Sequence, residues 1–260
     1  MRPLAMSSVP KIAIARASGF PPDPPSPPRG LHVVPSPDQR EDAILRAALE
    51  ASDRALPALS LSELWNDCVG GRLRVCLESV QADSILLVVR EAVGGRCLDP
   101  TDESWLRRVL CGEQQKALAL ERDIASSTLS TRYNRAIREL GIPRREVPVL
   151  LALAAQSAAG AALTVSARMA SFEHDGARCS VVGIPRPATA SMVILSAAER
   201  QVARWVIEGC SRREIAARRG TTKHTASRQI HSIFAGLGVS NRYALIRRAA
   251  ELRCFCSERS

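Results

Sequence analysis

The sequence predicts a mainly α-helical chain with small β-hairpins, in which two four-helix units are each preceded by a hairpin. Three observations support this fold class. Apolar residues recur at helical spacing between Leu195 and Leu252. The same pattern occurs 97 positions earlier in the chain. Two runs of β-branched and apolar residues, each interrupted by a short turn, lie ahead of the two helical segments.

The first 40 residues are rich in proline, most densely from Pro21 to Pro28. Such a segment cannot bury enough apolar surface to fold, which predicts a disordered tail with polyproline-II character over 1–40. From Glu41 onward, the apolar spacing predicts a helix that ends before Pro57. Ser62 is a candidate N-cap for a second, short helix that ends at Gly70.

Two hairpins are expected. The first pairs Arg72–Glu78 with Ser84–Arg90, so that 41–97 holds helices plus one hairpin. The second pairs Thr164–Phe172 with Ala177–Ile184 through a turn at His174-Asp175-Gly176, and 156–190 holds this hairpin and a linker.

Four helices are expected between Leu195 and Leu252. Gly209, Gly220 and Gly238 mark the ends of the first three, because glycine adopts the left-handed conformation that closes a helix. Thr222 and Asn241 are suitable N-caps for the third and fourth. The second and third helices, joined by a tight turn, form a helix-turn-helix.

This segment resembles the DNA-binding domain of LuxR/FixJ-type (GerE-like) bacterial transcription regulators. The matching positions are Leu195, Glu199, Val202, Gly209, the run from Ser211 to Ala216, Gly220, Thr225, Ile233, Leu237-Gly238-Val239 and the run from Arg242 to Leu245. The resemblance implies a cytoplasmic regulator that binds double-stranded DNA as a homodimer. The chain departs from the family pattern at Arg219, Ala226, Gln229 and Gly236.

A shift of 97 positions lays Leu98–Ile142 over Leu195–Val239 without a gap, and ten of the 45 positions are identical. Ordinary residue frequencies would give roughly three. Residues 98–155 are therefore interpreted as a second, degenerate copy of the helix-turn-helix unit, and 191–260 as the DNA-binding copy.

The net charge is +10, and its distribution favours a polyanionic partner for the second copy. Residues 191–260 hold 13 Lys and Arg against 5 Asp and Glu, whereas 98–153 hold 9 against 8. No apolar stretch is long enough to span a membrane. Glycine-rich phosphate loops, helical metal-ligand pairs and nucleophile elbows are absent, so we expect no catalytic residues, no cofactor and no metal.

Within the second copy, Arg212 and Arg213 are expected to approach the DNA backbone. Thr222 and Lys223 open the third helix, where backbone amides and a cation can meet a phosphate. The residues expected to face the groove or contact phosphate farther along this helix are Thr225, Ser227, Arg228, Gln229 and His231.

The degenerate copy offers a second candidate set for DNA contact, namely Ser127, Ser130, Thr131, Arg132 and Arg135. By resemblance, the fourth helix of the C-terminal unit supplies dimer contacts at Tyr243, Ala244, Leu245, Arg247 and Arg248. Tandem copies could instead let one chain cover two half-sites. The alternative function is a double helix-turn-helix scaffold that binds RNA polymerase or another regulator, as a sigma region-four-like or anti-activator module would. A small-molecule sensor would need a larger pocket than 41–90 can supply.

Overall fold

The structure is a computed structural model that describes residues 37–52, 58–142, 147–163, 165–185 and 194–252. Most of the predicted proline-rich tail lies outside these residues. The described helices are α1 Pro37–Ser52, α2 Leu61–Val69, α3 Pro100–Leu110, α4 Gln115–Glu121, α5 Ser126–Glu139, α6 Val149–Ala158, α7 Ala197–Ile207, α8 Arg212–Arg219, α9 Lys223–Leu237 and α10 Arg242–Glu251. The strands are β1 Ala58–Leu59, β2 Leu73–Val80, β3 Ser84–Glu91, β4 Ala167–His174 and β5 Ala177–Pro185.

The two predicted hairpins, β2–β3 and β4–β5, are both present, but they belong to one antiparallel sheet in the order β1-β4-β5-β3-β2. The hairpins are joined by β3 and β5, which pair from Ser84 opposite Pro185 to Arg90 opposite Cys179. Residues Ile85 to Val89 of β3 are all buried, so this strand has apolar surface on both faces. A sheet with two apolar faces requires a covering layer on each side.

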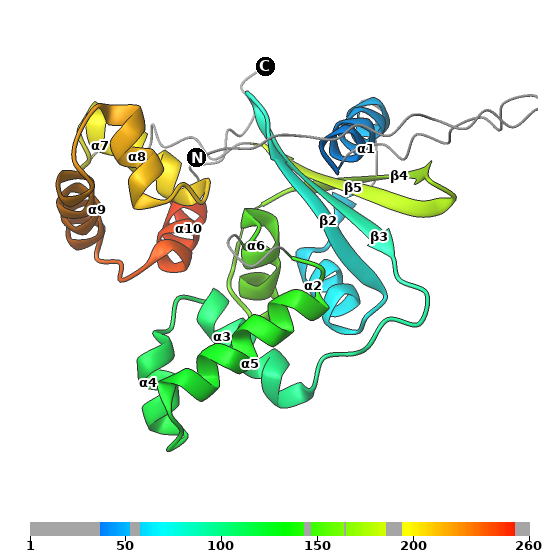
Figure 1. The fold of residues 1–260 in the computed structure, drawn as a ribbon, viewed down its shortest axis with the longest axis horizontal. Helices are drawn as coiled ribbons and strands as arrows, with labels where there is room; N and C mark the ends of the chain where they lie inside the picture. Colours follow the sequence, from blue (N-terminus) through cyan, green and yellow to red (C-terminus); the bar gives the residue numbers. More distant parts are fainter. Residues whose placement is uncertain (1–36, 53–57, 143–146, 164, 186–193, 253–260) are drawn as a thin grey trace, which may run out of the picture. The chain divides into compact units, whose positions relative to one another are not determined.

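Helices supply both layers (Figure 1). On one face, Ala48 of α1 packs against Leu86 and Val181. On the other face, α2 and α6 pack against each other and against the sheet, with Trp65 and Leu87 in the same apolar cluster. The sheet is therefore the middle layer of an α/β/α arrangement, which is more β structure than the mainly α-helical prediction implied.

Local turn chemistry explains the ends of these elements. Asp175 and Gly176 have φ angles of 49° and 68°, as a two-residue hairpin turn of this hand requires. The predicted cap of α2 was wrong by two residues, because the N-cap is Ser60 and Ser62 lies inside the helix. The two hydroxyl oxygens lie 2.7 Å apart.

The helices reproduce the 97-residue shift seen in the sequence. The helices α3, α4 and α5 begin at positions 100, 115 and 126, while α7, α8 and α9 begin at 197, 212 and 223. Buried positions correspond as well, since Leu118 matches Ile215 and Ala136 matches Ile233. We call α3–α5 the first helical unit and α7–α10 the C-terminal unit. Among the described helices, none has the length and apolar character needed to cross a membrane.

Candidate nucleic-acid interface

The C-terminal unit is held together by matched helix caps. Ser196 and Glu199 at the start of α7 form a reciprocal capping box, and Ser211 and Glu214 do the same for α8. These hydrogen bonds to the serines lower the pKa of both glutamates below the ordinary value. Each box satisfies amide groups that the first turn of a helix cannot pair internally.

The turn between α8 and α9 has the geometry that the sequence predicts. Gly220 closes α8 with a φ angle of 61°, and Gly238 closes α9 with a φ angle of 66°. The hydroxyl of Thr222 accepts a hydrogen bond of 3.1 Å from the backbone amide of Thr225. The predicted cap is thus confirmed, and α9 begins at Lys223, in a turn whose residues Thr222 to Thr225 are exposed.

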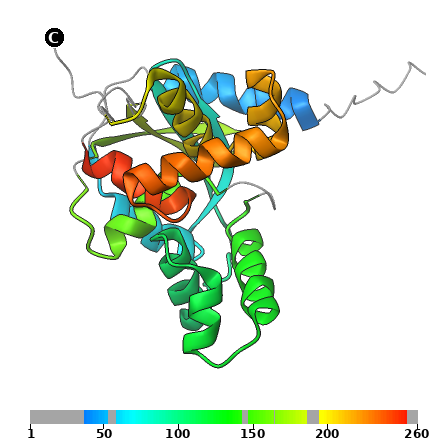
Figure 2. The same ribbon diagram turned by 90° about the vertical axis from the view of Figure 1, so that its left-hand side faces the viewer.

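The inner side of α9 anchors the helix and leaves its outer side exposed. Ala226, Ile230 and Ile233 are buried against the rest of the unit. The exposed candidates are Lys223, Thr225, Arg228 and His231. In Figure 2, α9 is the orange helix that runs across the front of the view.

Two candidates on α9 are less accessible. Ser227 and Gln229 are half-buried, and the side-chain oxygen of Gln229 is buried without a hydrogen-bond partner in the described structure. A buried carbonyl oxygen without a donor is unfavourable, so this side chain gains by rotating outward. The predicted contact of Gln229 with a base therefore requires a change of rotamer.

Four cations lie on the two helices of the helix-turn-helix: Arg212 and Arg213 at the start of α8, and Lys223 and Arg228 in the first two turns of α9. All four are exposed. Within the described residues, no carboxylate lies within ion-pair distance of any of them. Arg212 and Arg213 lie at the N-terminus of α8 and Lys223 lies at that of α9, where the helix dipole also favours an anion. We call these four residues the cationic surface.

Residues 193–249 match the family model for bacterial regulatory proteins of the luxR family (GerE). This stretch contains α7, α8, α9 and most of α10. It is a LuxR-family helix-turn-helix domain. Such domains are typical of DNA-binding transcriptional regulators. The family model detects no second copy in the chain. A search of curated proteins finds no match.

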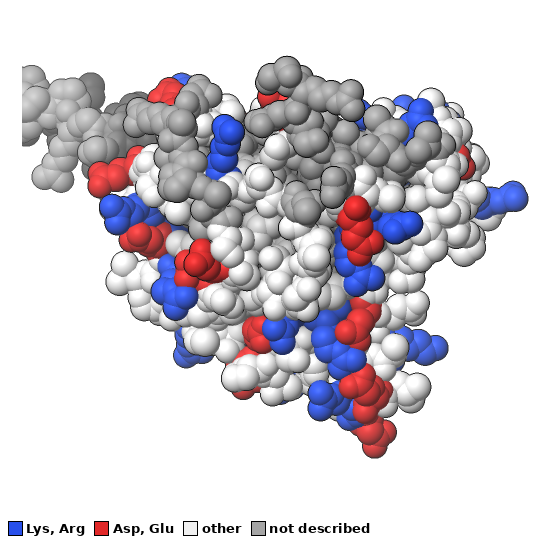
Figure 3. Space-filling view, turned by 180° about the vertical axis from the view of Figure 1, so that it is seen from behind, with Lys and Arg blue, Asp and Glu red and all other residues white. Residues whose placement is uncertain are grey.

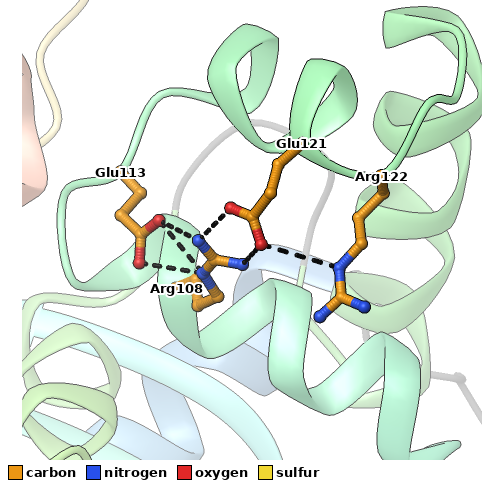
Figure 4. A network of polar contacts seen from close by, with 4 residues as sticks. All are labelled: Arg108, Glu113, Glu121 and Arg122. Atoms are coloured by element: carbon orange, nitrogen blue, oxygen red, sulfur yellow. Dashed lines mark hydrogen bonds and ion pairs between the residues drawn. The ribbon is translucent and has the colours of Figure 1, made fainter.

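The first helical unit differs from the LuxR-family domain in how its charges are compensated. Figure 4 shows the guanidinium of Arg108 between two carboxylates. Its Nε atom lies 3.0 Å from Glu113, and its Nη2 atom lies 2.6 Å from Glu121. These hydrogen bonds raise the pKa of Arg108 and lower that of Glu121. Glu121 in turn lies 3.7 Å from Arg122.

Two of the three arginines of α5 are compensated in the same way. Asp102 of α3 is almost completely buried and forms ion pairs with Arg132 and Arg135. Arg132 also lies over the ring of Trp105, 4.7 Å from its centroid. Figure 3 shows Lys and Arg side chains interspersed with Asp and Glu side chains toward the lower right of the face it presents. Two of the five predicted contact residues of α5 are therefore held by a carboxylate of their own unit.

The other three predicted residues of α5 carry only hydroxyl groups. Ser127 and Thr131 are exposed, and Ser130 is half-buried. The hydroxyl of Thr131 donates a hydrogen bond of 2.9 Å to the backbone carbonyl of Ser127. The α5 surface is polar, but the two arginines in the predicted contact set, Arg132 and Arg135, are compensated.

The residues predicted for dimer contacts on α10 fall into two groups. Leu245 is buried in the main apolar cluster, while Tyr243 and Ala244 are half-buried against the first helical unit. Arg247 and Arg248 are exposed, and each lies within 3.6 Å of Glu251. Much of the predicted dimer surface is thus in contact with the same chain.

Proposed function

We propose that this protein is a sequence-specific transcriptional regulator that binds double-stranded DNA through α8 and α9 of its LuxR-family domain. The observation that carries the proposal is the cationic surface, whose four side chains, at the start of α8 and in the first turns of α9, are exposed and have no ion-pair partner among the described residues. The cations of such a helix attract the DNA phosphates, and its other side chains can contact base edges in the groove. Sequence-specific binding needs both kinds of contact.

The roles of the individual residues follow from their positions. Arg212 and Arg213 at the start of α8 would neutralise backbone phosphates without reading sequence. Lys223 and the free amides at the start of α9 would hold another phosphate. Arg228, one turn into α9, can donate two hydrogen bonds to a guanine edge.

Three neutral side chains and one histidine complete the predicted contact set. Thr225 and Ser227 would face the base edges, and Gln229 would pair with adenine after its side chain rotates outward. His231 is exposed one turn beyond Ser227 and would contact phosphate. All of these contacts lie on one helix, which would occupy the major groove.

We infer that 98–155 is a degenerate copy of the same unit that acts as a scaffold. The common helix starts and buried positions support a shared architecture. The internal compensation of Arg108, Arg132 and Arg135 disfavours phosphate binding by this unit. A contact between its near-neutral surface and RNA polymerase or another regulator is the second candidate function for this half of the chain.

A titration with random duplex at two salt concentrations tests the proposal. We expect affinity to fall steeply as salt rises, because bound cations release counterions from DNA. The double variant Arg212→Ala, Arg213→Ala should weaken binding. The matched variant Gln115→Ala, Lys116→Ala alters the corresponding positions of α4 and should leave binding unchanged. Binding that neither depends on salt nor responds to the α8 variant would exclude DNA recognition by this surface.

A further inference from the structure

The N-terminal end of α10 contacts the first helical unit near Gly112. The side-chain nitrogen of Asn241 donates a hydrogen bond of 2.7 Å to the backbone carbonyl of Gly112. Ala244 lies so close to Gly112 that a methyl group on this glycine would come within 3.1 Å of it. Gly112 also has a φ angle of 100°, which favours glycine. The close approach of α10 at Ala244 therefore requires a glycine at position 112.

Further contacts join α10 to α6 and to the end of α3. The fully buried Gln156 of α6 donates hydrogen bonds to the backbone carbonyls of Leu110, at 3.0 Å, and Tyr243, at 3.1 Å. Arg242 donates a hydrogen bond of 2.9 Å to the carbonyl of Val147, just before α6. A buried amide that satisfies carbonyls from two helices is costly to expose or to leave unpaired. We call these contacts the α10 seam.

The two halves of the chain contribute equivalent hairpins to the sheet. Its four long strands follow the order β4-β5-β3-β2, so the second strand of each hairpin pairs with that of the other. The pairing of Leu87 with Val182 lies near the middle of both strands. On one side of the sheet, α2 packs against α6, and each of these helices immediately precedes a hairpin. A symmetric dimer would obtain such pairing from two chains, whereas here one chain provides both halves.

The two halves nevertheless carry different side chains at the reading positions. At the 97-residue shift, Arg228 corresponds to Thr131, and Lys223 corresponds to Ser126. A two-fold dimer uses identical reading helices and therefore binds two identical half-sites related by symmetry. The helices α5 and α9 cannot impose that symmetry on DNA.

We propose that the first helical unit is the built-in partner of α10, so that the protein recognises a non-palindromic DNA site as a monomer. The monomeric state follows from the α10 seam and the shared sheet. The non-palindromic site rests in addition on the proposed function. The partner that fits the buried face of α10 is thus α6 of the same chain, together with the end of α3 and the residues just after it.

Light scattering on the full chain without DNA tests the monomeric state by itself. We expect the mass of one chain from low to high micromolar concentration. The double variant Arg247→Glu, Arg248→Glu reverses the charge on the exposed side of α10 and should leave this mass unchanged. A dimer of the unaltered protein would overturn the monomeric state, and its dissociation by this variant would show that α10 binds a second copy.

Selection of bound sequences from a random duplex pool, using the full chain, tests the DNA site. The expected result is one non-palindromic motif bound by one chain per duplex. A palindromic motif occupied by two chains would overturn the inference. Failure to bind any duplex would overturn the proposed function and the non-palindromic site together. The mass measurement would still decide the role of the α10 seam.

Discussion

The phenolic oxygens of Tyr133 on α5 and Tyr243 on α10 lie 3.0 Å apart, although 110 positions separate them in the chain. Both rings are half-buried and pack against two apolar clusters, one in the first helical unit and one that extends through the LuxR-family domain. The contact therefore couples the orientation of the LuxR-family domain to that of the first helical unit. Neither tyrosine has a tyrosine at the corresponding position of the other unit.

A double-mutant cycle on this pair should reveal a direct coupling. Each single variant, Tyr133→Phe and Tyr243→Phe, leaves one hydroxyl without its partner and should lower the free energy of unfolding by about 1 kcal/mol. The double variant should cost less than the sum of the two, with a coupling of about 0.5–1.5 kcal/mol. Urea denaturation of all four proteins measures this, and strict additivity would show that the hydroxyls do not interact.

Stability should also decline at alkaline pH through Tyr133. Burial, with a smaller effect of Tyr243, raises the pKa of Tyr133 well above its ordinary value of about 10. The folded protein therefore holds this proton more tightly than the unfolded chain. The resulting stability is present below about pH 10 and is lost as pH rises further. Burial also raises the pKa of Cys68, to about 12, and this acts in the same direction.

Comparison of Tyr133→Phe with the unaltered protein isolates the tyrosine contribution, because Cys68 is present in both. The urea concentration at the midpoint of unfolding should fall between about pH 8 and about pH 11 in both proteins, and this fall should be smaller in the variant. An equal fall in the two proteins would mean that Tyr133 does not resist ionisation in the folded state.

Local features of the LuxR-family domain could be predicted from the sequence. Thr222 caps α9, and Gly220 and Gly238 end helices, because these roles depend on a few neighbouring backbone groups. The capping boxes at Ser196 and Ser211 were readable in the same way, since a glutamate follows each serine by three positions.

Long-range features could not be predicted. Either hairpin could have covered its own helices, and nothing in the spacing of β3 and β5 shows that these strands pair. The partners of Asp102 are 30 and 33 positions away, and only the packing of α3 on α5 brings them together. Similarly, Gln156 interrupts an apolar run, but its role depends on carbonyl groups from two other helices.

Asp102→Asn should destabilise the first helical unit. The substitution removes the charge that Arg132 and Arg135 share, at a site where the carboxylate is almost completely buried. We expect a loss of about 1–3 kcal/mol in the free energy of unfolding. Glu251→Gln is the matched control, because Glu251 also faces two arginines but is exposed, and it should cost less than about 1 kcal/mol. Equal effects in denaturation experiments would show that burial of Asp102 adds nothing.

Two glycine substitutions should change stability in opposite directions. Gly236 is exposed inside α9, and a methyl group there would meet no atom within 4 Å. Gly236→Ala should therefore stabilise the protein by about 0.5–1 kcal/mol, measured by thermal or urea unfolding. Gly112→Ala should destabilise it, because both the φ angle and the contact with Ala244 oppose a side chain. Stabilisation by Gly112→Ala would contradict the close approach in the α10 seam.

Substitutions on the cationic surface should separate affinity from sequence preference. Arg228→Ala removes a side chain that can read a guanine, so binding to the selected site should weaken by about 1–3 kcal/mol, with little change for random duplex.

Arg213→Ala should instead weaken both duplexes alike and reduce the salt slope by about 1, because a phosphate contact carries no sequence information. Lys116→Ala is the matched control, since Lys116 is the exposed counterpart of Arg213 in the first helical unit and should have no effect. Titrations of the selected and random duplexes at several salt concentrations distinguish these outcomes. If Arg213→Ala changed preference and Arg228→Ala did not, the recognition helix would approach DNA in a different orientation from the one proposed.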